Sequence, residues 1–206
     1  MATGVRPPRL MRSVSPTAGG MGMRISAVVA SLMTLALGSI MPETSGLASG
    51  RVPAVRVENN TLINSRAGYY FNLPADWSLK SDSDYQSVEV AHPSSRARFS
   101  VGYERARGDA NAYSMALLMA LKSPSSGWVN QNMRGVTVGG HAGSEMSGTR
   151  TTRERGITSE RFCVVVDGEY VYTISSSVPR EQADGRGVDI EQILSSFNWG
   201  KPLKAK

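Results

Sequence analysis

Two apolar runs decide the fold, Phe162-Cys163-Val164-Val165-Val166 and Tyr170-Val171-Tyr172-Thr173-Ile174, and only Asp167, Gly168 and Glu169 separate them. Runs rich in β-branched and aromatic residues form strands. Asp-Gly supplies the positive φ values that a type I′ hairpin turn requires. We therefore predict a hairpin with Asp167-Gly168 as its loop, in which Val166 faces Glu169.

This pairing divides the apolar side chains between two faces of the hairpin. Val165 then faces Tyr170, and Cys163 faces Tyr172. One face carries Cys163, Val165, Tyr170, Tyr172 and Ile174, and the other carries Phe162, Val164, Val166 and Val171. Because both faces are apolar, we expect the hairpin inside a sheet that is covered on one face and at least partly on the other.

Two helices are predicted around further strands. The last helix is amphipathic, because Ile190, Ile193, Leu194 and Phe197 recur at i, i+3, i+4 and i+7. A second helix runs to Leu121 from an N-cap near Asp109, and its apolar positions go nearly all the way round, so we expect it to be well buried. Further strands are predicted at 68–73, 85–91, 97–103, 133–139 and 142–151.

The N-terminal quarter predicts an export signal over residues 1–48. Four arginines, Arg6, Arg9, Arg12 and Arg24, precede the apolar run 25–41, and small residues lead to a cleavage site after Ala48. Two alternatives stay open. In the first, the apolar run is a membrane anchor, although its length of about 17 residues is only at the lower limit for a span. In the second, residues 1–22 are an extension ahead of the true start or an organellar transit peptide.

Charge and cysteine content exclude several classes of protein. The chain has 23 basic and 17 acidic residues, and without residues 1–48 there remain 19 and 16, about +3. So small an excess gives no electrostatic footprint for nucleic acid. Cys163 is the single cysteine, and with only His92 and His141, both expected at the surface or in loops, there is no zinc pattern. We predict a monomer with no metal and no cofactor.

Three segments resemble the PsbP-like superfamily. The first is Gly-Tyr-Tyr-Phe-Asn-Leu-Pro-Ala-Asp-Trp at 68–77, an aromatic strand followed by Pro-x-x-Trp. The second is Val-Thr-Val-Gly-Gly-His-Ala at 136–142, and the third is Ile-Leu-Ser-Ser-Phe at 193–197, which closes the last helix. Together these segments span most of the chain after the export signal.

The resemblance implies an α+β fold, an α/β/α sandwich on a curved, mainly antiparallel sheet. This domain would cover residues 68–199, after a lead-in at 49–67 that is partly disordered or forms a short edge strand, and before a basic tail at 200–206. The superfamily includes the extrinsic photosystem II protein of the thylakoid lumen, a Ran-binding transport factor and exported bacterial proteins. No established enzyme is known to us among them, and their functions come from surfaces that bind partners, although fold alone does not fix function.

We therefore expect a periplasmic or secreted accessory protein that binds a protein partner. If the source is photosynthetic, the expectation becomes a lumenal protein associated with photosystem II. Four arginines form the candidate partner site, on a predicted hairpin with its tip around residues 154–156: Arg150, Arg153, Arg155 and Arg161. Arginine binds carboxylates and phosphates, so an acidic partner or an anionic membrane surface fits them. The alternative is a solubilising edge hairpin whose charges prevent sheet-to-sheet aggregation.

Two other functions stay open. A small apolar-ligand carrier would need a cavity between the sheet and the Met-rich helix at 111–121. A hydrolase would need His141, Ser144 and Glu145 to converge in a cleft. The sequence shows no catalytic constellation, since Ser147 lacks the glycine two residues earlier that a nucleophile elbow requires. We therefore predict that the chain is not an enzyme.

Overall fold

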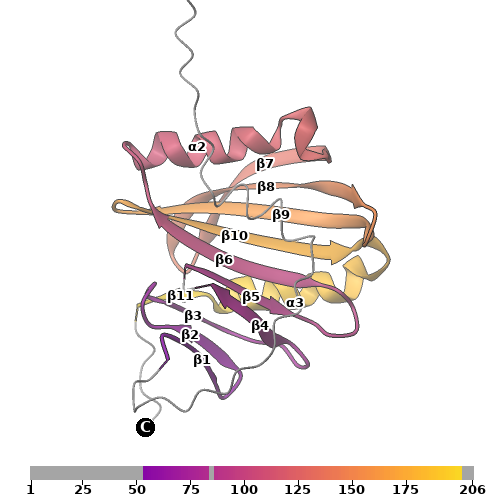
Figure 1. Ribbon diagram of the computed structural model, residues 1–206, viewed down its shortest axis with the longest axis horizontal. Coiled ribbons are helices and arrows are strands. Elements are labelled where there is room, and N and C mark those ends of the chain that lie inside the picture. Colours follow the sequence, from indigo (N-terminus) through magenta and orange to yellow (C-terminus); the bar gives the residue numbers. More distant parts are fainter. Residues whose placement is uncertain (1–52, 84–85, 201–206) are drawn as a thin grey trace, which may run out of the picture. The chain divides into compact units, whose positions relative to one another are not determined.

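The computed structural model describes residues 53–83 and 86–200 (Figure 1). The predicted export signal and residues 201–206 of the predicted basic tail lie outside the described residues. Within the described ranges, no helix combines the length and the apolar character that crossing a membrane requires.

Seven strands form the main antiparallel sheet, in the order β4-β5-β6-β10-β9-β8-β7. Figure 1 shows them side by side, with β4 and β7 at the two edges. Their bounds are β4 Ser78–Ser83, β5 Ser87–Ala91, β6 Arg98–Arg105, β7 Trp128–Val138, β8 His141–Thr152, β9 Gly156–Asp167 and β10 Tyr170–Pro179. Six of the seven overlap strands that the sequence predicts, and β4 is an addition.

A second, four-stranded sheet has the order β1-β2-β3-β11. Its bounds are β1 Val55–Glu58, β2 Thr61–Asn64, β3 Tyr69–Asn72 and β11 Asn198–Trp199. The loop between β1 and β2 is Asn59-Asn60, and both residues have positive φ, 48° and 58°, as a type I′ turn requires. Residues 49–67 are expected to be partly disordered or to form a short edge strand, and within them β1 is such an edge strand, followed by β2.

The central hairpin forms with a different loop from the predicted one. Tyr170 pairs with Asp167, so the two loop residues are Gly168 and Glu169, and only Gly168 has positive φ, at 58°. Glycine at the first loop position alone is the pattern of a type II′ turn. Val165 consequently pairs with Tyr172, and Cys163 with Ile174. Because the pairing is displaced by two residues, every side chain stays on its predicted face.

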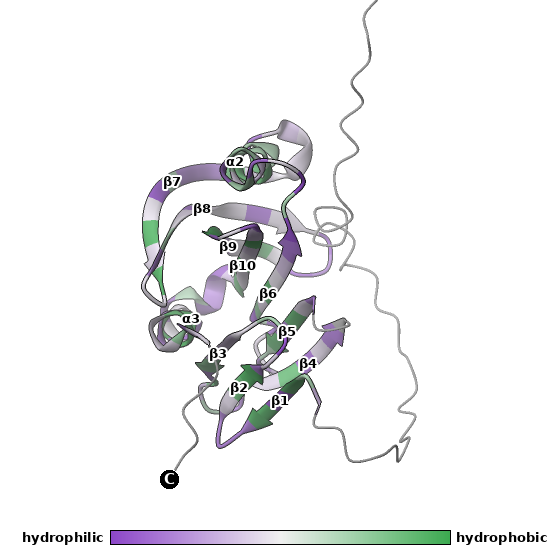
Figure 2. Ribbon diagram, turned by 90° about the vertical axis from the view of Figure 1, so that its left-hand side faces the viewer, coloured by the Kyte–Doolittle hydropathy of each residue, from purple (hydrophilic) through white to green (hydrophobic). Residues whose placement is uncertain are grey.

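Two α-helices cover opposite faces of the main sheet (Figure 2). They are α2 Ala110–Leu121 and α3 Ala183–Ser196, and short 3-10 helices, η1 Pro124–Ser126 and η2 Arg180–Gln182, precede β7 and α3. Ile190 and Ile193 of α3 share one core with Cys163 and Val165. Because neighbouring residues of a strand point to opposite faces, buried Phe162 and Val164 face α2, which contacts β9. The predicted α+β fold is confirmed.

Aromatic side chains fill the core between the two sheets. The ring of Phe197 stacks on Tyr69 and Phe71, with centroids 5.4 and 5.7 Å apart. Trp199 closes the end of this core and donates a hydrogen bond from Nε1 to the Val138 carbonyl, at 2.9 Å. A Cβ at Gly139 would lie 2.7 Å from the Trp199 ring. The close approach explains why a glycine ends the Val-Thr-Val run.

Candidate functional site

The four arginines of the predicted partner site do not form one surface. The hairpin between β8 and β9 exists, and its tip is the turn of residues 153–155. Arg150 pairs with Thr158, and Arg161 pairs with Ser147. Since side chains alternate along a strand, Arg161 points to the α3 face and Arg150 to the α2 face. Arg153 is exposed at the tip.

Arg161 binds a buried carboxylate on the α3 face. Its Nη2 lies 2.7 Å from Oε2 of Glu145, whose side chain is only 2% exposed. Arg134 of β7 approaches the other oxygen, with Nη2 2.9 Å from Oε1. Arg161 also pairs with Glu191 of α3. The four charges, two of each sign, link β7, β8, β9 and α3.

The electrostatics of this cluster disfavour reactivity. Burial alone would raise the pKa of Glu145, but the hydrogen bond and charge of Arg161, the Cys163 thiol and the charge of Arg134 outweigh it and lower the pKa. Burial, followed by the nearby charge of Glu145, raises the pKa of Cys163. Near neutral pH the carboxyl is therefore ionised and the thiol protonated, so neither a general acid nor a thiolate nucleophile is available here.

An apolar groove lies beside this cluster, between α3 and the strands β9 and β10. Its volume is about 400 Å³. Val178, Val188 and Ile190 give it apolar walls, and the charged side chains that line it are Arg161, Asp184 and Glu191. Val188 is 65% exposed, more than the other exposed large hydrophobic side chains among the described residues. The groove is therefore a candidate site for an apolar group.

Sequence reasoning missed Arg134, Val188 and Glu191. The signal for Arg134 was present, because Gly139 and Gly140 form a two-residue loop with positive φ at both positions, 57° and 86°. Such a loop fixes the register of its hairpin, and this register places Arg134 opposite Glu145. Nothing in the sequence indicates that Val188 and Glu191 lie beside Arg161, since that contact depends on how α3 crosses the sheet.

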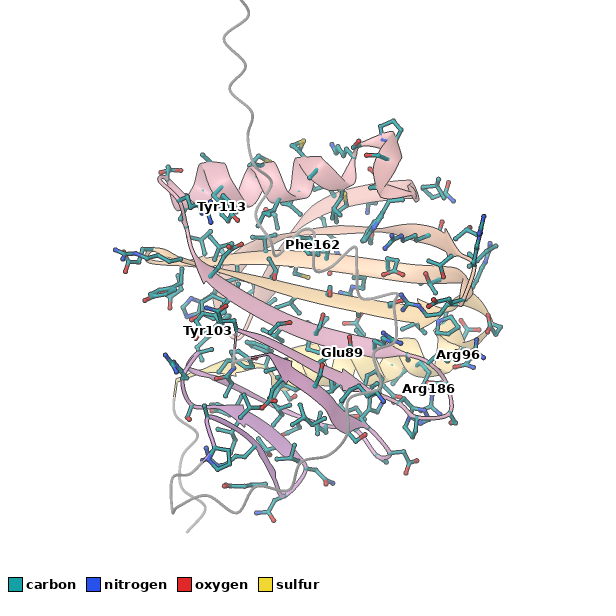
Figure 3. The ribbon with its side chains drawn as sticks, viewed as in Figure 1. Glu89, Arg96, Tyr103, Tyr113, Phe162 and Arg186 are labelled. Carbon is teal, nitrogen blue, oxygen red and sulfur yellow. The ribbon has the colours of Figure 1, made fainter. Side chains whose placement is uncertain are left out.

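Arg155 belongs to a polar cluster on the α2 face of the sheet, with Ser177 and Glu160. Arg155 donates a hydrogen bond from Nη1 to Ser177 Oγ at 2.9 Å, and Ser177 donates to Glu160 at 2.8 Å. Burial lowers the pKa of Arg155. Figure 3 shows Phe162 near α2, whereas Glu89 lies farther from it on the same sheet. Arg155 is thus held by the domain, and Arg153 is the freest of the four.

The three residues proposed for a hydrolase do not converge. Ser144 and Glu145 are neighbours on β8 and point to opposite faces of the sheet. His141 packs against Trp199, with ring centroids 5.1 Å apart. This arrangement removes the cleft that the hydrolase hypothesis requires.

Burial differs from expectation at one histidine and in the Met-rich helix. His92 lies in the loop after β5, as predicted, but it is buried rather than at the surface, only 4% exposed, with Nδ1 3.3 Å from Ser94 Oγ and its ring edge-on to Trp77. The Met-rich helix is less buried than predicted, because Met115 and Met119 are 44% and 39% exposed. Only Leu117, Leu118 and Leu121 of α2 are buried.

The cavity that the ligand-carrier hypothesis places between the sheet and α2 is not among the grooves described. The groove beside Arg161 has no α2 residue in its lining, and neither has a second groove formed by Ser94, Ser95, Gln182, Gly185 and Arg186. In the part of the chain that the structure describes, no group of three or more His, Cys, Asp and Glu side chains is arranged to hold a metal ion.

Comparisons with known proteins identify the fold. No family model matches the sequence, and no curated protein matches it. Among solved structures, the chain is similar to LpqN of Mycobacterium tuberculosis, involved in cell envelope biogenesis, with a TM-score of 0.51 and 12% identity over 65% of this chain and 83% of that one.

Two further solved structures show lower scores. A protein of Bacteroides thetaiotaomicron has a TM-score of 0.49 and 14% identity over 69% of this chain and 48% of its own. Cyanobacterial PsbP of Synechocystis sp. PCC 6803 has a TM-score of 0.47 and 15% identity over 75% of this chain and 98% of its own. LpqN is a member of the PsbP-like fold. From the likeness to LpqN we conclude that this chain has the PsbP-like fold that its sequence motifs predict.

Proposed function

We propose that the chain is an exported, non-catalytic accessory protein that binds a protein partner in the groove between α3, β9 and β10. The observation that carries the proposal is Val188, which is 65% exposed in an apolar groove of about 400 Å³. Concave surfaces with mainly apolar walls and a few charged groups are typical of binding sites.

The charges of the groove indicate the chemistry of the partner. Arg161 is already paired with Glu145 and Glu191. Asp184 and Glu191 at the same groove leave its lining with one more negative than positive charge. A partner segment with an apolar side chain beside a lysine or arginine would match both features. Arg153, exposed at the hairpin tip, stays a separate candidate for contact with an acidic or anionic surface.

The absence of catalysis is supported by the state of the most buried charge cluster. Glu145 is held ionised by two arginines, so it acts as a fixed anion. Its role in this proposal is to hold Arg161 in the wall of the groove. The arrangement resembles a scaffold for recognition more than a site for proton transfer.

Export is supported by two independent features. The arginines and the apolar run of residues 1–48 have the pattern of a signal peptide. LpqN, which shares the fold, is involved in cell envelope biogenesis. Both favour an extracytoplasmic location for this chain.

The test is capture of partners from cells of the source organism with two matched variants. Val188→Arg places a bulky cation in the groove, whereas Val57→Arg makes the same change at a valine that is 43% exposed on β1, in the other sheet. We expect wild type and Val57→Arg to enrich the same partner and Val188→Arg to lose at least about tenfold, a change of about 1.4 kcal/mol in binding. Equal enrichment by both variants, or no enrichment by wild type, would contradict the proposal.

A further inference from the structure

β7 forms one edge of the main sheet and is long and accessible. Among the described residues it pairs only with β8. It spans 11 residues, and seven consecutive residues, 132–138, are paired with β8 without interruption. Asn132, Met133, Arg134, Gly135 and Thr137 are exposed. Such an edge presents unpaired backbone donors and acceptors to any other strand.

The edge β4 of the main sheet and the edge β1 of the second sheet carry the usual protection against such pairing. β4 has 6 residues, a bulge between Leu79 and Ser81, and Lys80 within that bulge. β1 has only 4 residues, with Arg56 and Glu58 among them. Shortness, bulges and charges are the features by which proteins block edge-to-edge association. β7 has one bulge, near its start between Val129 and Asn132, and one charged residue in the evenly paired stretch, Arg134, which binds its own Glu145.

Residues 132–138 are self-complementary in an antiparallel pair. With Gly135 opposite Gly135 of a second copy, Arg134 lies opposite Val136 and Met133 lies opposite Thr137. No like charges face each other directly, and each Arg134 is already paired with its own Glu145. A Cβ added at Gly135 would meet nothing within 4 Å, so a side chain can be introduced here without a clash inside the chain.

We propose that β7 is a dimer interface, at which two copies of the chain pair antiparallel about Gly135 and join their main sheets. The pairing is isologous, because the same residues contribute from both copies and a two-fold axis passes between the two Gly135 residues. It replaces the monomer expected from the sequence. It does not depend on the groove at Val188, which lies on α3.

Disulfide cross-linking tests the register directly. In an antiparallel pair, directly opposed Cα atoms lie about 4.5–5.5 Å apart, a separation that a disulfide spans. Gly135→Cys should therefore link to itself under mild oxidation. Thr137→Cys is the matched control, since its own counterpart would lie about 14 Å away, four residues along the strand at about 3.4 Å each. Native Cys163 is buried and does not compete.

Sedimentation of the whole chain supplies a second measurement. Wild type should sediment as a dimer, and Thr137→Lys, which places a cation at the edge, should sediment as a monomer. Ser81→Lys makes the same change on β4 and should leave the dimer intact. A wild-type monomer at about 100 μM, a concentration at which even a weak dimer forms, would overturn the proposal. So would equal cross-linking of Gly135→Cys and Thr137→Cys, whereas loss of partner capture by Val188→Arg alone would leave it unaffected.

Discussion

Two arginines of one hairpin, Arg161 and Arg153, illustrate how a strand separates residues that are close in sequence. Arg161 is in the body of the sheet, with a side chain 21% exposed, and is paired with two carboxylates. Arg153 lies at the tip, exposed to solvent. Arg155, two residues on, is half-buried and bonded to Ser177. These three arginines, although close in sequence, therefore occupy three different environments in the fold.

The largest effect that would test this comparison is expected for Glu145→Ala. The substitution leaves Arg161 partly buried without its main counter-ion, which costs about 3–5 kcal/mol when one partner of a buried pair is removed. Urea unfolding measures the change in the free energy of unfolding. Glu154→Ala, an exposed carboxylate at the tip of the same hairpin, is the control and should have no measurable effect. Equal losses of stability in Glu145→Ala and Glu154→Ala would contradict the difference between the buried part and the exposed tip of the hairpin.

A smaller effect is expected from pH, because a protonated carboxyl still fills the site. The pKa of Glu145 is lower in the folded state than its ordinary value. The stabilisation from its charge is therefore complete above the ordinary glutamate range and is lost as the pH falls through the folded pKa. Unfolding at several pH values should show this loss in wild type and a reduced slope in Glu145→Gln. An identical slope in both proteins would mean that the Glu145 charge does not stabilise the fold.

Arg155→Ala should lower the free energy of unfolding less than Glu145→Ala and more than Arg153→Ala. It removes one hydrogen bond to Ser177, at 2.9 Å, and leaves Glu160 near fewer positive charges. A single hydrogen bond to a charged group is worth about 1.5–3 kcal/mol at most sites, and partial exposure puts Arg155 at or below the lower end. Arg155→Lys, which keeps the charge without the planar fork, shows whether geometry or charge matters. If neither variant changes the free energy of unfolding, Arg155 contributes as little to stability as Arg153 is expected to contribute.

The smallest effect is expected for Arg153→Ala. Its exposed side chain has no hydrogen bond or ion pair among the described contacts, so stability should not change measurably. The variant is informative about binding for that reason. A weaker association with anionic vesicles, measured by sedimentation at low salt, would support a surface role for the hairpin tip. Unchanged association would leave the tip as a solubilising element.

The sequence was sufficient for features that depend on local pattern. The central hairpin, both faces of its strands and the N-cap of α2 follow from alternation, helical spacing and capping chemistry. Asp109 accepts a hydrogen bond from the Ala112 amide at 2.7 Å, as its position predicts. The loop of the hairpin was misplaced because Asp-Gly and Gly-Glu are both acceptable turn pairs, and the choice depends on neighbouring strands.

Features that depend on packing between distant segments could not be derived in the same way. The four arginines were grouped because they are close in sequence, and assigning them to opposite faces requires the register of β8 with β9. The groove requires the angle at which α3 crosses β9 and β10. Val188 falls outside the apolar stripe of α3 that faces the core, so periodicity marks it only as a surface residue.

The measurement that tests the central claim most directly is photo-crosslinking from the groove in living cells of the source organism. A photoreactive amino acid replaces Val188 in one protein and Val57 in the other, both exposed valines on the described surface. We predict a defined cross-linked species from position 188, with a partner segment that carries an apolar residue beside a basic one, and none from position 57. The same species from both positions, or none from either, would contradict partner binding in this groove.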